Sequence, residues 1–232
     1  MGNILLIETS TALCSVALAQ DGAVTSYRES SAPKAHASLT AVFIQEMLAE
    51  RGLTLADCDA VCVSKGPGSY TGLRVGVSTA KGLCFGSGKP LLAVGTLDTL
   101  VAQAATVIPS EVEGSTFRYI IPMIDARRME VYTAVFENGV QITETAPAII
   151  DETSFAEYLE QGPCLFIGDG AGKCADVIKH PNAHFRQCCP KASAMLQPAM
   201  TAYKEKRFED VAYFEPFYLK EFVATVSKKK LF

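Results

Sequence analysis

One glycine-rich segment carries the residue types that could hold a phosphate or another anion. Residues 65–76 read Lys-Gly-Pro-Gly-Ser-Tyr-Thr-Gly-Leu-Arg-Val-Gly, and they follow a strand-like run and open a helix-like one. Backbone N–H groups and a helix N-terminus can bind an anion in that setting. The segment departs from the phosphate-loop pattern, because Gly72 is followed by Leu73 and Arg74. A tight turn that binds nothing would need the same glycines, so both interpretations stay open.

Two acids are the candidates for nucleotide or acid–base chemistry. Glu8 and Asp125 each end a short apolar run that is typical of a buried strand. A nucleotide-dependent kinase or ATPase would use one of them as its acid, and this is the enzymatic alternative. Residues Gly168, Asp169 and Gly170 could also face a nucleotide, although they serve equally well as a strand-to-helix turn.

Histidine and cysteine spacing predicts no metal ligand and no catalytic residue. The H-x-x-x-H spacing occurs at His180 and His184, without the H-E-x-x-H motif of a zinc peptidase. A peptidase therefore remains only a minor alternative. The eight cysteines contain no C-x-x-C pair, and we interpret the vicinal pair Cys188 and Cys189 as ordinary packing, with redox or metal chemistry as the minor alternative. This cysteine pattern indicates a reduced, cytoplasmic protein.

Composition narrows the possible partners further. The 232 residues include 21 Lys and Arg against 25 Asp and Glu, for a net charge of −4, and 49% of them are hydrophobic. An acidic chain of this kind is not expected to grip nucleic acid alone. It has no apolar run of the roughly 18–20 residues that span a membrane, and we expect no signal peptide, because its first residues lack a basic segment. The lysines at 228–230 are a solvated end or a minor RNA contact.

An internal repeat indicates a duplicated lobe. Each acid is followed thirteen residues later by a hairpin signal, Asp21-Gly22 in the first half and Asn138-Gly139 in the second. The offset of 117 residues needs no gap. The expected third strands run through Val24 and Tyr27 and, in the second half, through Ile142. Two such arrangements in the same order predict two similar lobes.

A helix and another strand follow each predicted strand triplet. Residues 35–51 and 155–159 have helical patterns, and residues 60–64 and 164–167 are strand-like. By analogy this is the α/β plan of the actin-like, Hsp70 and sugar-kinase superfold, with two βββαβα lobes of ribonuclease H-like type. We expect the first lobe at residues 1–108, joined by a returning C-terminal helix at about 212–232, and the second lobe at 109–211. The boundary is expected within residues 103–118.

Two helices of the first lobe are predicted to form a protein–protein surface. In the helix after the glycine segment, Gly72, Gly76, Ala80, Cys84 and Gly88 form an i, i+4 row with little bulk, which could make a groove for another helix. The helix at 35–51 is apolar over more than one face. Both helices could instead fill one core. The predicted interface residues are Leu39, Phe43, Met47, Tyr70, Gly72, Leu73, Gly76, Val77 and Ala80.

Five motifs together resemble the TsaB (YeaZ) family, and they run in order over nearly the whole chain. They are Ile-Glu-Thr-Ser at 7–10, Gly-Pro-Gly-Ser-Tyr-Thr-Gly-Leu-Arg-Val-Gly at 66–76, Lys-Gly-Leu at 81–83, Ile-Asp-Ala-Arg-Arg-Met-Glu-Val-Tyr at 124–132 and Glu-Pro-Phe-Tyr-Leu-Lys at 215–220. The resemblance implies the actin-like fold and a non-catalytic subunit. Such a subunit pairs with TsaD, which with TsaE installs threonylcarbamoyl on the adenosine beside the tRNA anticodon. It implies that tRNA is reached through the complex, and that copies self-associate.

Departures from the relatives favour a scaffold over an enzyme. The catalytic paralogue TsaD has an H-x-x-x-H metal pair after the strand expected here at 90–94, and Thr96 and Leu100 stand at those positions. Neither side chain is a useful ligand for iron or zinc. Ser10 stands where nucleotide-binding relatives have glycine, and its side chain would crowd a phosphate bound to the backbone. We therefore expect no cofactor in this chain, with a nucleotide at the subunit interface as the alternative.

Overall fold

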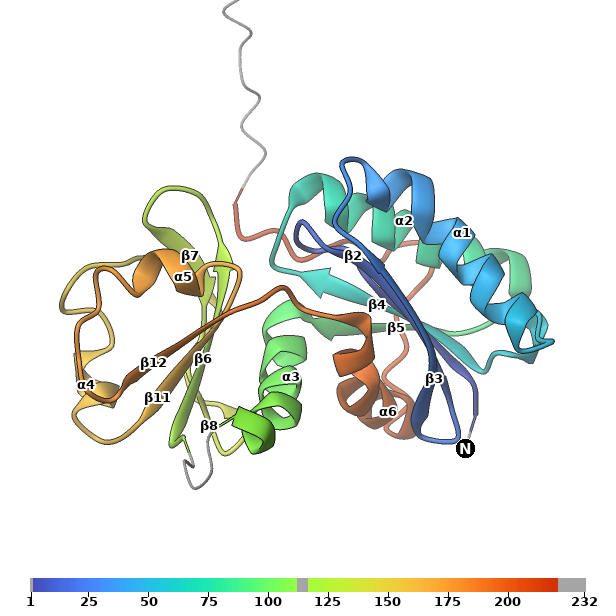
Figure 1. Cartoon of the computed structure of the whole chain (residues 1–232). Helices are drawn as coiled ribbons and strands as arrows, with labels where there is room; N and C mark the ends of the chain where they lie inside the picture. Colours follow the sequence, from blue (N-terminus) through green and yellow to red (C-terminus); the bar gives the residue numbers. More distant parts are fainter. Residues whose placement is uncertain (1, 112–116, 221–232) are drawn as a thin grey trace, which may run out of the picture.

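The first lobe is built on a five-stranded mixed sheet. The structure is a computed structural model that describes residues 2–111 and 117–220. The central strand of this sheet pairs antiparallel with one neighbour and parallel with the other, in the order β3-β2-β1-β4-β5 (Figure 1). The strands are β1 (Ile4–Glu8), β2 (Cys14–Gln20), β3 (Ala23–Ser30), β4 (Ala60–Gly66) and β5 (Leu91–Gly95).

The second lobe repeats this sheet. Its main path runs β10-β7-β6-β11-β12, with antiparallel and parallel pairs in the same places as in the first sheet. The strands are β6 (Tyr119–Asp125), β7 (Glu130–Thr133), β10 (Ala146–Ile149), β11 (Cys164–Gly168) and β12 (Ala183–Gln187), with β8 (Phe136–Glu137) and β9 (Val140–Gln141) beside them. The predicted duplication of the lobe is confirmed, with the exception of the expected third strand of the second half.

Both predicted hairpin turns form, but the second joins different strands from those expected. Asp21 and Gly22 have φ of 50° and 83°, and Asn138 and Gly139 have φ of 52° and 78°, as a two-residue turn of this type requires. The second turn links only the short strands β8 and β9. The long third strand is β10, so the strand expected at Ile142 is wrong. Pro147 hid β10 from the sequence pattern, because proline is tolerated in a sheet only at an edge.

Helices cover both faces of the first sheet. One face carries α1 (Ala35–Glu50) and α2 (Tyr70–Ser87), and the other carries η2 (Ala192–Met195) and α6 (Leu196–Lys204) (Figure 1). The short turn η1 (Leu55–Asp57) precedes β4. Side chains alternate along a strand, so Leu5 and Ile7 of β1 pack under α1 and α2 while Ile4 and Leu6 pack against η2 and α6.

The second sheet is covered by α3 on one face and by short helices on the other. The helix α3 (Thr96–Glu111) lies between the lobes and packs on β6 and β11. The opposite face carries α4 (Ala156–Leu159) and α5 (Ala171–Cys174). No helix within residues 2–111 and 117–220 is both long and apolar enough to cross a membrane.

The C-terminal part of the chain returns to the first lobe earlier than expected. The helix predicted to return was 212–232, yet residues 212–220 contain no helix and 221–232, including Lys228–Lys230, lie outside the described residues. Instead η2 and α6, expected in the second lobe, pack on the first sheet. The predicted boundary at 103–118 falls partly inside α3.

Candidate functional site

The glycine segment packs on the turn that follows β1. The amide of Ser69 donates to the carbonyl of Ser10 at 2.6 Å. A Cβ atom on Gly68 would lie 2.3 Å from that same Ser10 oxygen, and one on Gly72 would lie 2.1 Å from the Thr9 oxygen. One turn along α2, a Cβ on Gly76 would lie 2.2 Å from the Thr9 hydroxyl. The glycines therefore let α2 approach a backbone turn of its own chain.

This packing overturns the predicted groove. Six of the nine predicted interface residues are buried inside the chain, and they are Met47, Gly72, Leu73, Gly76, Val77 and Ala80. A row of small residues does signal close approach, but here the approaching backbone belongs to the 8–11 turn and not to a partner helix. The remaining three predicted residues, Leu39, Phe43 and Tyr70, are half-buried.

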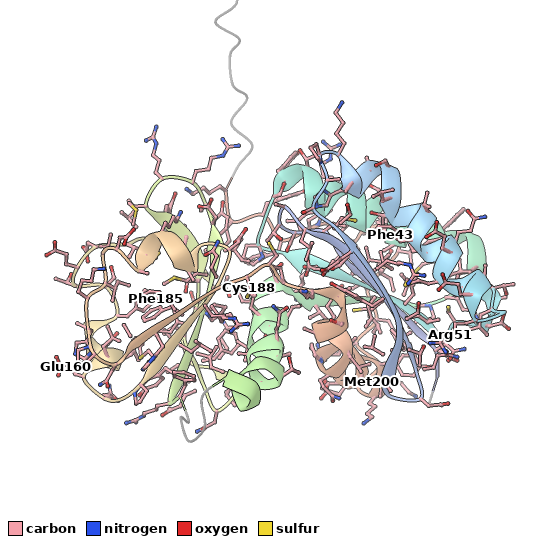
Figure 2. The ribbon with its side chains drawn as sticks, viewed as in Figure 1. Phe43, Arg51, Glu160, Phe185, Cys188 and Met200 are labelled. Carbon is pink, nitrogen blue, oxygen red and sulfur yellow. The ribbon has the colours of Figure 1, made fainter. Side chains whose placement is uncertain are left out.

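An apolar surface nevertheless remains on the outer side of α1 and α2. Phe85 of α2 is 86% exposed and Val42 of α1 is 42% exposed. Phe43 and Leu39 of α1 are half-buried, and Phe43, labelled in Figure 2, also packs against the core beneath the helix. We call Val42, Phe43, Leu39 and Phe85 the helix face. Phe85, a large aromatic side chain left almost fully exposed, makes this face the candidate contact surface of the first lobe.

Glu8 is a buried acid with an incomplete set of partners. Burial raises the pKa of Glu8 to about 7, while hydrogen bonds from Ser10 act in the opposite direction. The Ser10 amide donates to Oε1 at 2.7 Å. Oε2 and the hydroxyls of Thr9, Ser10 and Thr11 are buried with no hydrogen-bond partner in the described part of the chain. Near neutral pH this carboxyl is close to half protonated.

The backbone groups of the Glu8 turn already have partners within the chain. A backbone-bound phosphate needs free N–H groups and open space above them. The Ser10 amide is already bonded to Glu8, and Ser10 itself is 1% exposed beneath the glycine segment. The Ser10 amide and the space above it are therefore taken up by contacts within the chain.

The second acidic turn is held by its own contacts. The Asp125 amide donates to Asp169 Oδ1 at 2.9 Å, and Lys173 pairs with the Asp125 carboxylate. Burial raises the pKa of Asp169. A Cβ on Gly168 would lie 2.1 Å from the Met123 oxygen, so this glycine is required by the turn itself. These residues lie together at the carboxyl ends of β6 and β11.

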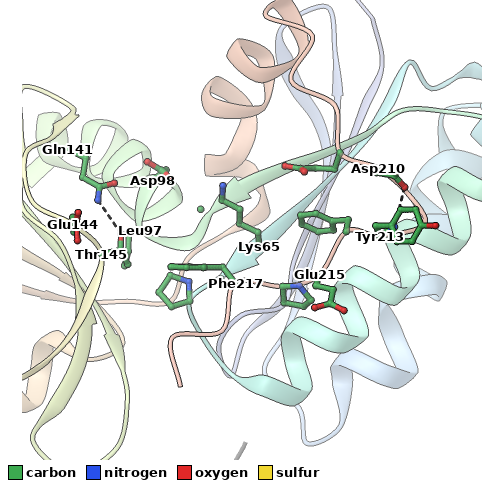
Figure 3. Close-up of a pocket in the computed structure, with 16 residues that line it drawn as sticks. Lys65, Leu97, Asp98, Gln141, Glu144, Thr145, Asp210, Tyr213, Glu215 and Phe217 are labelled. Atoms are coloured by element: carbon green, nitrogen blue, oxygen red, sulfur yellow. Dashed lines mark hydrogen bonds between the residues drawn. The ribbon is translucent and has the colours of Figure 1, made fainter. Parts of the chain in front are cut away.

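A cleft of about 870 Å³ lies between the lobes beside Lys65 (Figure 3). Four separate segments line it, and this is why the sequence did not reveal it. They are residues 65–67, 95–98, 141–145 and 209–217. Asp98, Glu144, Glu209, Asp210 and Glu215 outnumber the single cation Lys65 along its walls. None of its lining residues is histidine or cysteine.

The positions expected for a metal pair are sealed in the core. Thr96 and Leu100 are each 0% exposed, and the Thr96 hydroxyl lies 2.9 Å from that of Ser64. Among the described residues, no group of three or more His, Cys, Asp or Glu is placed to hold a metal ion. His184 instead packs edge-on against Phe117, with ring centroids 5.1 Å apart.

The contacts of the vicinal cysteines Cys188 and Cys189 indicate a structural role. Gln103 donates to the Cys189 carbonyl at 3.0 Å and contacts Cys188 Sγ at 3.4 Å, and Figure 2 shows Cys188 on the crossing between the lobes. Burial raises the pKa of the Cys188 thiol to about 11. Since the thiolate is the reactive form, this thiol is a poor nucleophile. All eight cysteines are free.

Comparisons with known proteins agree with the fold and identify similar proteins. The family described as TsaD, tRNA N6-adenosine threonylcarbamoyltransferase, matches residues 28–227. The Escherichia coli protein named "tRNA threonylcarbamoyladenosine biosynthesis protein TsaB" is 34% identical over 95% of this chain and 96% of its own length. The YeaZ structure from Pseudomonas aeruginosa superposes with a TM-score of 0.80 at 27% identity, covering 94% of this chain and all of that one.

A more distant structure shows the wider fold class. An activator of 2-hydroxyisocaproyl-CoA dehydratase from Clostridium difficile superposes with a TM-score of 0.50 at 10% identity, over 88% of this chain and 96% of that one. It belongs to the actin-like superfold, and it supports the fold alone. The predicted actin-like class is confirmed.

Proposed function

The chain belongs to the TsaB (YeaZ) family of tRNA threonylcarbamoyladenosine biosynthesis proteins, and we propose that it is the non-catalytic subunit that activates a TsaD-type partner. Its role lies in the modification of tRNA adenosine, within the TsaD-containing assembly. We infer that it holds and activates the catalytic subunit through the helix face.

One observation carries the non-catalytic role. The positions that would hold the partner's metal pair are Thr96 and Leu100 here, and both are fully buried in a core that offers no ligand atoms to solvent. Supporting it, the Glu8 turn is closed by the glycine segment. We propose that this chain supplies no complete nucleotide site, and that any nucleotide at the subunit boundary relies on residues of the partner.

The helix face is the proposed contact with TsaD. Phe85 and Val42 are exposed on adjacent helices of the first lobe, with Phe43 and Leu39 beside them. Apolar and aromatic side chains that are exposed in one subunit are typical anchors of an interface. A TsaE-type ATPase is the proposed third component. In the absence of TsaD the same face would join two copies of this chain, and the free cysteines agree with a place in the cytoplasm.

The test is incorporation of labelled threonine into unmodified tRNA by the precursor-forming enzyme, TsaD and TsaE, with and without this chain. Incorporation that depends on the chain supports the proposal. Equal incorporation without it contradicts an activating role.

A further inference from the structure

A pair of unpaired arginines lies in the turn between β6 and β7. Arg127 and Arg128 are exposed and have φ of 72° and 51°. The turn is closed by the Glu130 amide, which donates to the Arg127 carbonyl at 3.1 Å. Positive φ costs roughly 1 kcal/mol for a residue with a Cβ, and glycine or asparagine normally fills such positions. Neither guanidinium forms an ion pair within the part of the chain that the structure describes.

The C-terminal segment brings this turn to the start of α2. Lys220 pairs with Glu130, which ends the arginine turn. Two residues earlier, Tyr218 packs on Tyr70, the first residue of α2, with ring centroids 4.8 Å apart. Figure 1 shows the segment that follows α6 reaching the space between the β6–β7 turn and α2. The two lobes thus present these side chains at one end of the cleft between them.

A third arginine joins the aromatic pair. The Arg74 guanidinium lies 5.5 Å from the centroid of the Tyr70 ring, and Arg74 is exposed. We call Arg74, Arg127, Arg128, Tyr70 and Tyr218 the arginine–tyrosine surface. It combines exposed guanidinium groups with two neighbouring tyrosine rings that are tilted by 33° to each other.

The balance of charge at this surface is opposite to that of the whole chain. Lys173 and Lys220 add two cations, which pair with the carboxylates of Asp125 and Glu130. Glu215 is a third carboxylate and acts on Tyr218. Asp169, whose Oδ1 accepts a hydrogen bond from the Asp125 amide, is a fourth carboxylate, so five cations lie near four carboxylates, although the chain carries a net charge of −4. A local excess of this kind attracts an anionic partner.

We propose that the arginine–tyrosine surface binds RNA, with the three arginines on backbone phosphates and the tyrosine pair beside an unstacked base. Aromatic rings next to guanidinium groups form the platform on which single-stranded or loop bases stack. An acidic protein segment would use the arginines but not the rings. The inference rests on the proposed function, in which the RNA is the tRNA substrate. Tyr70 opens the same helix that carries Phe85 near its other end, so RNA seated here would leave the helix face open to the proposed partner.

The test uses a variant that removes charge without straining the turn. Arg127→Asn together with Arg128→Gly places residues suited to positive φ at both positions, so we expect unchanged or higher thermal stability. The matched control is Lys204→Asn with Lys206→Gly, which removes two positive charges at the end of α6, where Lys206 has φ of 56°. Figure 1 separates α6 from the arginine turn. Arg74→Gln is a second, independent variant.

The readout is direct binding of fluorescent unmodified tRNA to the complex of this chain with TsaD and TsaE, across a salt series. Losing two phosphate contacts is expected to weaken binding about tenfold or more at low salt, and to flatten the plot of log K against log salt by about 1.4–1.8. The control is expected to bind like the parent. Equal affinity and slope in the arginine variant would overturn the inference. So would loss of TsaD from the complex at intact fold, because the surface would then be a protein contact.

Binding does not require turnover, which separates this inference from the proposed function. If the parent complex binds tRNA through these arginines but threonine incorporation is independent of this chain, the surface stands and the activating role fails. If incorporation depends on the chain while the arginine variant binds tRNA normally, the reverse holds.

Discussion

Gly72 of α2 lies directly against the carbonyl group of Thr9, so close that a Cβ atom on Gly72 would sit 2.1 Å from the oxygen. Gly76 stands in the same relation to the Thr9 hydroxyl at 2.2 Å. This contact fixes the first turn of α2 against the end of β1. It also explains why the glycines cannot serve as a groove for a partner.

Replacing these glycines by alanine is expected to destabilise the fold. The added methyl group must displace backbone in a packed core, and we expect Gly72→Ala to lower the free energy of unfolding by about 3 kcal/mol. The matched control is Gly82→Ala in the same helix, where nothing lies within 4 Å of the new Cβ. That change should stabilise the chain by up to about 1 kcal/mol. Chemical denaturation measures both, and an equally stable Gly72→Ala protein would contradict the packing described here.

Glu8 is expected to make stability depend on pH. Its folded pKa of about 7 lies above the ordinary value of 4.5, so the folded chain binds the proton more tightly than the unfolded chain. The contribution of this carboxyl is then fully present below about pH 4.5 and is lost as the pH rises toward 7. The loss is of the order of 3 kcal/mol.

Glu8→Gln isolates this effect from other titrating groups. The amide keeps the shape and carries no charge, so the variant should match the parent near pH 5 and exceed its unfolding free energy near pH 8. Denaturant titrations at the two pH values give the difference. A parent that loses no stability relative to Glu8→Gln between them would mean that Glu8 is not desolvated as the structure indicates.

Lys81 is expected to hold the C-terminal segment on α2. Its ammonium group donates to the carbonyls of Ala212 and Phe214 at 3.1 Å and 2.9 Å. Three residues further on, the Phe217 amide donates to the backbone carbonyl of Lys65 at 2.7 Å. Lys81→Met should therefore speed hydrogen exchange at the Phe217 amide roughly tenfold, because the bonds of a charged donor are lost. Exchange in β1 should not change. Unaltered exchange at Phe217 would show that the segment is held independently of Lys81.

The sequence predicted the strands that pair locally better than the contacts between distant segments. The turns at Asp21-Gly22 and Asn138-Gly139 have a chemical signature, and the repeat they mark reproduces the strand order of both sheets. The end of the helix expected at 35–51 was also well predicted, since Gly52 follows α1 with φ of 65°, whereas Gly88, which was assigned to the row within the next helix, is the residue that ends α2. Short-range chemistry of this kind is visible in a single chain.

The candidate site was harder to predict for a physical reason. The row of small residues Gly72, Gly76 and Ala80 indicates that another segment packs closely against α2. The sequence does not indicate which segment that is. The cleft beside Lys65 combines residues as far apart as 65 and 217, and no periodicity links them. The return of η2 and α6 to the first sheet was missed for the same reason. The interface itself, now assigned to the helix face, stays a prediction.

The most direct measurement compares two double variants in the threonine-incorporation assay with TsaD, TsaE and unmodified tRNA. Glu8→Gln with Asp125→Asn removes both candidate acids, while Val42→Glu with Phe85→Glu places charges on the helix face. If this chain acts only as an activating subunit, the first variant keeps a rate within about threefold of the parent, because a working acid would be worth about 10²–10⁴. The second, still folded by circular dichroism, falls to the rate without the chain. Loss of activity in the acid variant with its complex intact, or full activity in the helix-face variant, would contradict this function.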